Sequence, residues 1–274
     1  MQLPSRIFGS LRGPAIKKRL IEWGSIALLV ALIVIPLGTL AWLAFFTNTF
    51  HVQAITVVDS REHTAAAIQD LTTSAKGRNI LFLQTPILEQ RILSSVPQVR
   101  DIYITRKLPN TLRVVVQEKT PAFLLLSNGM YFFVDAQGIA YEQAELGTLP
   151  GTILPIIKNN DQTASLQIGQ PAVETSFVEF IIQAQEDIPA VTEADIVEMR
   201  IPSLSAREVH VLLNNNWIIR FDTTRHLSLQ VNVLQRLLAH TITEEEKEYI
   251  EYVDLRISNR VYYKLRDNAP VSDR

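Results

Sequence analysis

The sequence predicts an α+β fold: one N-terminal transmembrane helix, a small β-α-α-β-β domain, and a β-rich domain with two helices. Three observations support this prediction. No Asp, Glu, Lys or Arg occurs from Trp23 to Val58, two helical patterns and two alternating runs lie between residues 50 and 120, and short apolar runs separated by turn residues follow. Apolar residues make up 47% of the 274 residues, enough for a folded core.

The stretch from Ile26 to Phe46 is the most apolar part of the chain. As a helix it spans about 30 Å, the thickness of a bilayer's hydrocarbon layer. We assign residues 23–47 to the membrane helix. Residues 1–22 carry five Lys or Arg residues against one acid, Glu22. Cationic flanks stay in the cytoplasm, so the tail of residues 1–22 is predicted inside and the domains outside. A cleaved signal peptide or a buried helix are the alternatives.

The first external domain is predicted over residues 50–120. Residues 52–59 read as a strand, and residues 63–75 have apolar side chains at helical spacing. Ile80–Phe82 are expected to return to the core. A second helix begins near Thr85, with Pro86 in its first turn, and ends at Pro97.

Two strands close this domain. Ile102 and Ile104 alternate with polar neighbours on the first strand, and Leu112, Val114 and Val116 alternate on the second. Pro109 and Asn110 suit the turn between them, so one face is expected to pack on the two helices.

The second domain is predicted over residues 121–266, with a flexible tail at 267–274. Its strands lie within 122–127, 130–135, 138–142, 194–203, 207–216 and 216–223, and one hairpin turns at Asn128-Gly129. Helices are predicted over 172–188 and 225–240. The acidic stretch 243–248 is expected to be a solvated linker. Two final strands are expected around Ser258-Asn259.

The stretch PQVRDIYITRKLPNTLRVVVQEKTPAF, followed by NGMYFFVDAQGIAYE, resembles a known domain family. The β-α-α-β-β order is similar to a POTRA domain. The pattern R-x-x-P-x-T-L-x-V-x-V-x-E-x-x-P and the later VD-x-x-G resemble the FtsQ/DivIB family of bacterial cell-division proteins. Lys119 stands where that family often has Arg. The closing segment is also similar, with Asp254-Leu255-Arg256 followed by a terminal hairpin strand.

Chemistry-bearing patterns are scarce. The five His residues show no metal-ligand spacing, the chain has no Cys, and no G-x-S-x-G, Walker or Rossmann pattern occurs. Charge runs such as Glu244–Glu246 fit a solvated surface better than an acid–base pair. We therefore predict no catalytic, cofactor or metal site and no small-molecule substrate. The net charge of −2 gives no global field for nucleic acid.

Binding at the terminal strand is the better hypothesis. An open sheet edge can pair with a partner strand. Val261, Tyr263 and Leu265 are expected on one face of this strand, with Tyr262 and Lys264 on the other. Arg256 is expected to pair with a carboxylate on the partner. Ile257 stands where relatives can carry Tyr, and it completes the predicted partner-binding set. The plain alternative is an ordinary sheet strand whose Lys264 guards the edge.

The resemblance implies a non-enzymatic scaffold of the division machinery, held by one helix in the bacterial inner membrane and enriched at the septum. The partners that it implies are FtsB/DivIC-like and FtsL-like membrane proteins, which add a strand to the terminal hairpin, and a septal peptidoglycan synthase. A POTRA-containing component of envelope protein assembly or secretion is the alternative. An envelope hydrolase is a weaker one, because no nucleophile or metal set was found.

Overall fold

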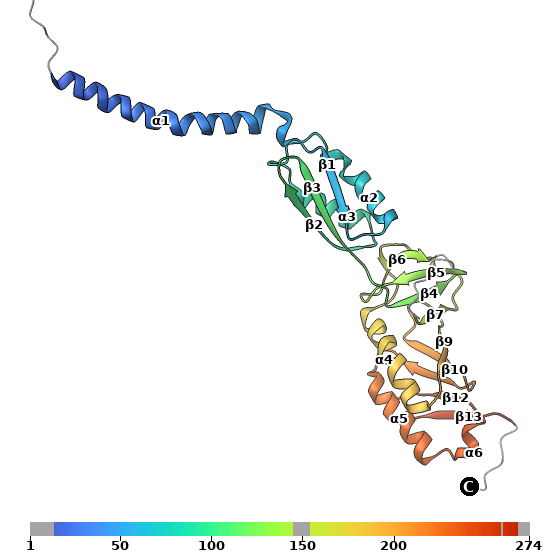
Figure 1. Ribbon diagram of the computed structural model, residues 1–274. Coiled ribbons are helices and arrows are strands. Elements are labelled where there is room, and N and C mark those ends of the chain that lie inside the picture. Colours follow the sequence, from blue (N-terminus) through green and yellow to red (C-terminus); the bar gives the residue numbers. More distant parts are fainter. Residues whose placement is uncertain (1–13, 145–153, 259, 268–274) are drawn as a thin grey trace, which may run out of the picture. The chain divides into compact units, whose positions relative to one another are not determined.

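The computed structural model describes residues 14–144, 154–258 and 260–267 (Figure 1). The chain divides into two compact units, residues 1–91 with 103–115 and residues 92–102 with 116–274. The predicted cytoplasmic tail up to residue 13 and the predicted flexible tail from residue 268 lie outside the described residues.

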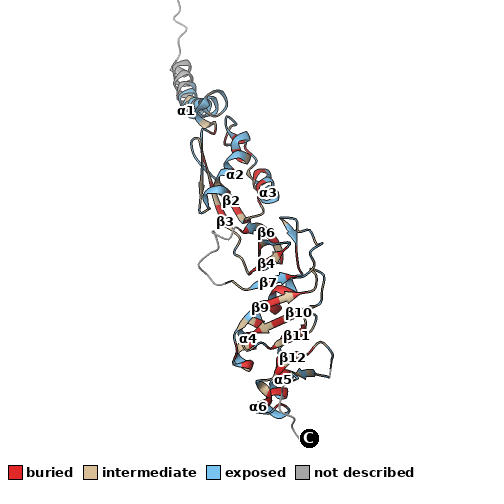
Figure 2. Ribbon diagram, turned by 90° about the vertical axis from the view of Figure 1, so that its right-hand side faces the viewer, coloured by how far each residue is buried: buried red, intermediate tan, exposed pale blue. Residues whose placement is uncertain are grey.

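Helix α1 (Pro14–Phe46) begins before the predicted start of the membrane span. Its stretch Ala27–Phe46 is 20 residues long, apolar enough to cross a membrane, and 0% buried (Figure 2). Pro36 lies inside the helix, and the Thr39 hydroxyl donates to the carbonyl of Ile35 at 3.0 Å. A fully exposed apolar helix of this length is stable only when lipid or another apolar surface covers it.

The first domain has the predicted order of elements. They are η1 (Asn48–Phe50), β1 (Ala54–Val58), α2 (Glu62–Thr72), η2 (Thr73–Ala75), α3 (Thr85–Ser95), β2 (Val99–Lys107) and β3 (Thr111–Glu118). The strands form one sheet in the order β1-β3-β2, with β1 parallel to β3. The alternation expected in β2 and β3 is confirmed, since Ile102, Ile104, Leu112, Val114 and Val116 are all buried.

The connection between α2 and α3 departs from the prediction. Ile80 is fully buried, as expected, but Leu81 is 37% exposed and Phe82 is 60% exposed. The backbone explains this difference. The Asn79 side chain accepts from the Leu81 N–H at 3.0 Å, and the Phe82 N–H donates to the Asn79 carbonyl at 3.3 Å. This tight turn directs the two apolar side chains outward.

The second domain contains one ten-stranded sheet and three helices among the described residues. They are β4 (Phe123–Ser127), β5 (Met130–Val134), β6 (Ile139–Ala144), β7 (Ile156–Asn159), β8 (Gln170–Pro171), α4 (Thr175–Thr192), β9 (Ile196–Ile201), β10 (Glu208–Leu213), β11 (Ile218–Asp222), α5 (Leu227–His240), α6 (Glu244–Lys247), β12 (Ile250–Asp254) and β13 (Tyr262–Leu265).

The sheet order is β13-β12-β11-β10-β9-β7-β4-β5-β6-β8. Strand β7 is parallel to both β4 and β9, so it joins the β4-β5-β6 meander to the C-terminal strands. The two ends of the sheet differ. Strand β8 has two residues and contains Pro171, which lacks an N–H, whereas β13 is a regular four-residue strand.

Helices α4 and α5 pack against each other beside the C-terminal strands (Figure 1). Phe177, Ile181 and Ile188 of α4 and Leu234 and Leu238 of α5 belong to one buried cluster with the inward side chains of β9 to β12. This large apolar core holds the C-terminal end of the sheet in place.

The turn after β5 is fixed by a buried acid. Asp135 accepts hydrogen bonds from the N–H groups of Gln137 and Ile139, both at 2.9 Å. Its other oxygen lies 2.6 Å from the ammonium of Lys119, whose side chain is 13% exposed. Gly138 has φ of 83°, and a Cβ there would lie 2.2 Å from the carbonyl oxygen of Val173. The VD-x-x-G pattern is thus a structural turn.

The acidic stretch after α5 corrects a prediction. It forms the short helix α6 instead of a solvated linker, and Glu246 is 5% exposed. Thr243 and Glu246 form a capping box, in which the Glu246 carboxylate accepts from the Thr243 N–H at 2.9 Å. The segment leading into β12 is therefore ordered by its own hydrogen bonds.

Candidate partner-binding edge

The described chain ends in a hairpin whose last strand lies at the rim of the ten-stranded sheet. Strand β13 pairs antiparallel with β12, with Val253 opposite Tyr263 and Asp254 opposite Tyr262. The register shifts between Ile250 and Tyr252, so the extra residue lies in β12 and β13 itself is regular. Among the described strands, none pairs with the outer edge of β13.

The side chains of β13 alternate as the sequence predicts. Val261, Tyr263 and Leu265 are partly buried and pack against the main core. Tyr262 is 46% exposed, and Lys264 points away from the core and forms an ion pair with Glu251 at 2.6 Å. That carboxylate raises the pKa of Lys264 above its ordinary value. The inner face anchors the strand, and the outer face offers an aromatic ring.

The hydrogen bond just after β13 shows which backbone groups of this strand face β12 and which face the outer edge. The N–H of Arg266 donates to the carbonyl of Tyr249 at 2.7 Å, toward β12. Successive residues of a regular antiparallel strand direct their N–H and C=O groups to opposite sides. The groups of Tyr262 and Lys264 therefore face β12, whereas those of Tyr263 and Leu265 face the outer edge of the strand.

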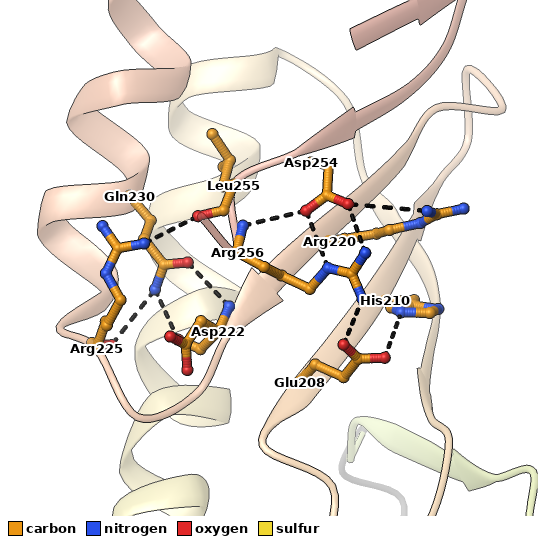
Figure 3. A network of polar contacts seen from close by, with 9 residues as sticks. All are labelled: Glu208, His210, Arg220, Asp222, Arg225, Gln230, Asp254, Leu255 and Arg256. Carbon is orange, nitrogen blue, oxygen red and sulfur yellow. Dashed lines mark hydrogen bonds and ion pairs between the residues drawn. The ribbon is translucent and has the colours of Figure 1, made fainter. Parts of the chain in front are cut away.

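Arg256 follows β12 and pairs within its own chain (Figure 3). Its Nε lies 2.9 Å from Asp254 Oδ1 and its Nη2 lies 2.5 Å from Asp254 Oδ2, and its Nη1 donates to the Glu208 carboxylate of β10. These bonds lower the pKa of Asp254 and raise that of Arg256. The structure thus gives this guanidinium two intramolecular carboxylates, where we expected one from a partner.

Two further side chains complete this cluster on the same face of β10 and β11. His210 Nε2 lies 3.2 Å from Glu208, and Arg220 Nη1 lies 3.8 Å from Asp254. The Arg220 guanidinium also lies over the Tyr252 ring, 4.6 Å from its centroid. Burial is the main cause that lowers the pKa of His210 below its ordinary value. The imidazole is therefore neutral near pH 7.

A second set of bonds fixes the loop between β11 and α5 against β12. Gln230 is 1% exposed; it accepts from the Asp222 N–H at 2.9 Å and donates to the Asp222 carbonyl at 2.8 Å. Arg225 donates to the Leu255 carbonyl at 3.0 Å (Figure 3). Contacts from β10, from β11 and from the β11–α5 loop therefore hold residues 254–256, where the connection to β13 begins.

The terminal hairpin was predicted from sequence, whereas Glu208, His210, Arg220 and Gln230 were not predicted to belong to this site. Alternation in β10 and β11 puts the first three on one face, and that was a usable signal. No sequence signal indicated that these residues lie near Arg256, because Glu208 and Arg256 are 48 positions apart. Ile257 is half exposed at the start of the connection to β13.

The described residues contain no group of three His, Cys, Asp or Glu placed to hold a metal ion. A hollow of about 950 Å³ lies at the start of α4, and Glu174 and Arg207 are its ionisable lining residues. The open edge of β13 remains the best-defined candidate site.

Together these features define a class of protein: a chain with one helix of membrane-spanning length, a POTRA domain, and a β-rich domain that ends in an open strand. The family comparisons agree. The model of the FtsQ-type POTRA domain matches residues 50–119, and that of the C-terminal domain of cell division protein FtsQ/DivIB matches residues 122–256. The chain belongs to the FtsQ/DivIB family of cell division proteins.

Individual relatives support this assignment. The chain is similar to cell division protein FtsQ of Streptomyces venezuelae, with 25% identity over 225 residues, which cover 80% of this chain and 78% of that protein. It is 24% identical to FtsQ of Streptomyces collinus over 117 residues, or 43% of this chain and 44% of that protein. It is 28% identical to DivIB of Clostridium acetobutylicum over 93 residues, or 34% and 37%.

Proposed function

We propose that this protein is a membrane-anchored scaffold of the bacterial division machinery, and that it binds other division proteins by strand addition to β13. The partners proposed are FtsB/DivIC-like and FtsL-like membrane proteins, with a septal peptidoglycan synthase as a further one. Helix α1 holds the chain in the inner membrane, with a cytoplasmic N-terminus, both domains outside, and enrichment at the septum. Family membership supports a role in division, and confinement to a membrane allows each contact to be modest.

The open edge of β13 is the observation that carries this proposal. The outward N–H and C=O groups of Leu265 provide a hydrogen-bonding template at this edge, and the exposed ring of Tyr262 adds apolar area with a polar tip. The packing of Val261, Tyr263 and Leu265 on the core keeps the strand extended before binding. A preformed edge lowers the entropic cost of pairing.

Arg256 has a different role in this proposal from the one predicted from sequence alone. A carboxylate on the partner would have to compete with Asp254 and Glu208, which already bind the guanidinium. We assign Arg256 as a positioning residue that fixes the start of the hairpin; its side chain is one-third exposed.

Amide hydrogen exchange at single-residue resolution tests the proposal directly. The full chain in detergent is compared alone and with a co-expressed FtsB/DivIC-like protein. We expect binding to slow exchange at Leu265, because its outward N–H gains a partner. The inward N–H of Lys264 is protected in both states and is the internal control. Binding without any change at β13 would contradict the proposal.

A pair of variants at one position separates backbone from side-chain effects. Leu265→Pro removes the outward N–H, whereas Leu265→Val shortens the side chain but keeps that donor and a strand-forming residue. We expect the proline variant to lose co-purification with the partner and the valine variant to retain most of it. A proline at Tyr262 is less informative, because it removes a group that faces β12. Equal binding by both Leu265 variants would refute strand addition.

A further inference from the structure

Exposed apolar and cationic side chains gather on two loops of the first domain. Phe82 and Leu108 are each 60% exposed and Leu81 is 37% exposed. Arg78 and Lys107, on the same two loops, are exposed as well. We call these five residues the anchor-side rim. Neither the open edge of β13 nor the buried core accounts for them.

The first loop of the rim is tied to the segment that follows the anchor. The N–H of Gly77 donates to the Val52 carbonyl and the N–H of Val52 donates to the Arg78 carbonyl, both at 2.9 Å. The N–H of Ile80 donates to the Phe50 carbonyl at 2.7 Å. The exposure of Leu81 and Phe82 is therefore a property of a fixed backbone, because loose loops do not keep such bonds.

The second loop is tied to the same segment. The Asn110 carbonyl accepts from the N–H of Gln53 at 2.9 Å, and the Arg106 guanidinium donates to the Leu83 carbonyl at 2.7 Å. Residues 48–53 follow directly on α1, which ends at Phe46. Both loops therefore lie at the end of the domain where the chain leaves the membrane helix.

Contacts with α1 itself fix the position of this rim relative to the membrane surface. The rings of Phe45 and Phe82 stack with centroids 5.2 Å apart, and the side chain of Asn79 donates to the Ala44 carbonyl at 2.6 Å. Ala44 and Phe45 belong to the apolar stretch Ala27–Phe46. When that stretch spans the hydrocarbon layer, a ring stacked on Phe45 lies at the boundary between lipid and water.

We propose that the anchor-side rim is a second membrane-binding surface that docks on anionic phospholipid headgroups. Leu81, Phe82 and Leu108 enter the interfacial layer, and Arg78 and Lys107 pair with lipid phosphates. A hollow of about 350 Å³ lined by Arg78, Phe82 and Ile87 gives a phosphate room beside the guanidinium. The inference rests on α1 as a membrane anchor, which is part of the proposed function, and not on partner binding at β13.

Spin labels measure the depth of the rim, and the absence of Cys makes every introduced Cys unique. Phe82→Cys, Leu108→Cys and Glu62→Cys are labelled in the full chain and placed in nanodiscs. Glu62 begins α2, beyond the end of β1 remote from the anchor, and serves as the control. We expect collision with oxygen to exceed collision with a water-soluble nickel chelate several-fold at 82 and 108, and the reverse at 62.

The lipid composition and a charge variant test the cationic part. Discs of phosphatidylcholine are compared with discs that also contain phosphatidylglycerol, which should seat the labels at 82 and 108 more deeply. Arg78→Gln with Lys107→Gln should abolish that difference. Labels at 82 and 108 that are as water-accessible as the control would overturn the proposal, as would labels shielded from both reagents, which indicate a protein cover. Depths unaffected by phosphatidylglycerol would overturn its charge component.

Discussion

Neutralising Arg256 should weaken the C-terminal domain by a predictable amount. In Arg256→Gln, the Asp254 and Glu208 carboxylates lose their shared cation, and their side chains are only 11% and 26% exposed. Exposed ion pairs contribute about 0–1 kcal/mol, whereas breaking a buried pair costs about 3–5 kcal/mol. Because the Arg256 side chain is 33% exposed, we expect an intermediate loss of about 2 kcal/mol. That loss lowers the Tm of a domain of this size by about 4–8 °C.

Fluorescence of Trp217 is a suitable reporter for this loss. Trp217 is 5% exposed within the core of the second domain, whereas the other two Trp residues lie in α1. Arg256→Gln, Asp254→Asn and the double variant form a thermodynamic cycle in the detergent-solubilised full chain. We expect a coupling free energy of about 1–2 kcal/mol between the two sites, within the range for hydrogen-bonded neighbours.

Charge reversal gives the sharper contrast. In Arg256→Glu, three carboxylates meet near Glu208 and Asp254, so the domain should be less stable than in the neutral variant. A Tm unchanged in Arg256→Gln, together with no coupling to Asp254, would refute the reasoning. Because Arg256→Glu is expected to be less stable, its partner binding must be compared with that of the wild type at temperatures well below the Tm of the variant.

Three further predictions follow from buried features of the second unit. Lys119→Ala leaves the Asp135 carboxylate buried without its cation, so urea unfolding followed by tryptophan fluorescence should show a loss of about 3 kcal/mol, and no loss would argue against the ion pair. Gly138→Ala forces a Cβ against the Val173 carbonyl at positive φ and should cost at least about 2 kcal/mol in the same assay; a neutral effect would show that the turn is not so constrained. Burial keeps the folded-state pKa of His210 below the unfolded value near 6.5, so the unfolded state takes up the proton first and stability falls as the pH drops below 6.5. Melting curves against pH should show this decline in the wild type and a shallower one in His210→Gln, and equal slopes would exclude His210 as its source.

The sequence alone predicted most of the architecture, because most elements carry their own periodicity, but the short elements β7, β8 and α6 were not predicted. Alternation at Ile102, Ile104, Leu112 and Val114 marks the β2–β3 hairpin, and the same signal at Val261, Tyr263 and Leu265 marks β13. Side-chain direction in a strand depends only on position, so these predictions needed no tertiary information.

What the sequence did not supply was the location of non-local partners. Arg256 was expected to bind a carboxylate on a partner, but Glu208 reaches it within the chain through the packing of β10, β11 and β12. Local errors had a different origin. Thr243-x-x-Glu246 is a capping-box pattern that lay within a charge run, and the pattern was overlooked in favour of its composition.

Because its two ends differ, the ten-stranded sheet can accept an added strand at the β13 end only. Growth past β8 stops at a two-residue strand with a proline, so one boundary cannot propagate pairing. Two copies of this sheet that met through β13 would close on each other as a symmetric pair and leave no second growing point. The protein can therefore expose an edge strand without forming fibres through this sheet, even where many copies share a small area of membrane.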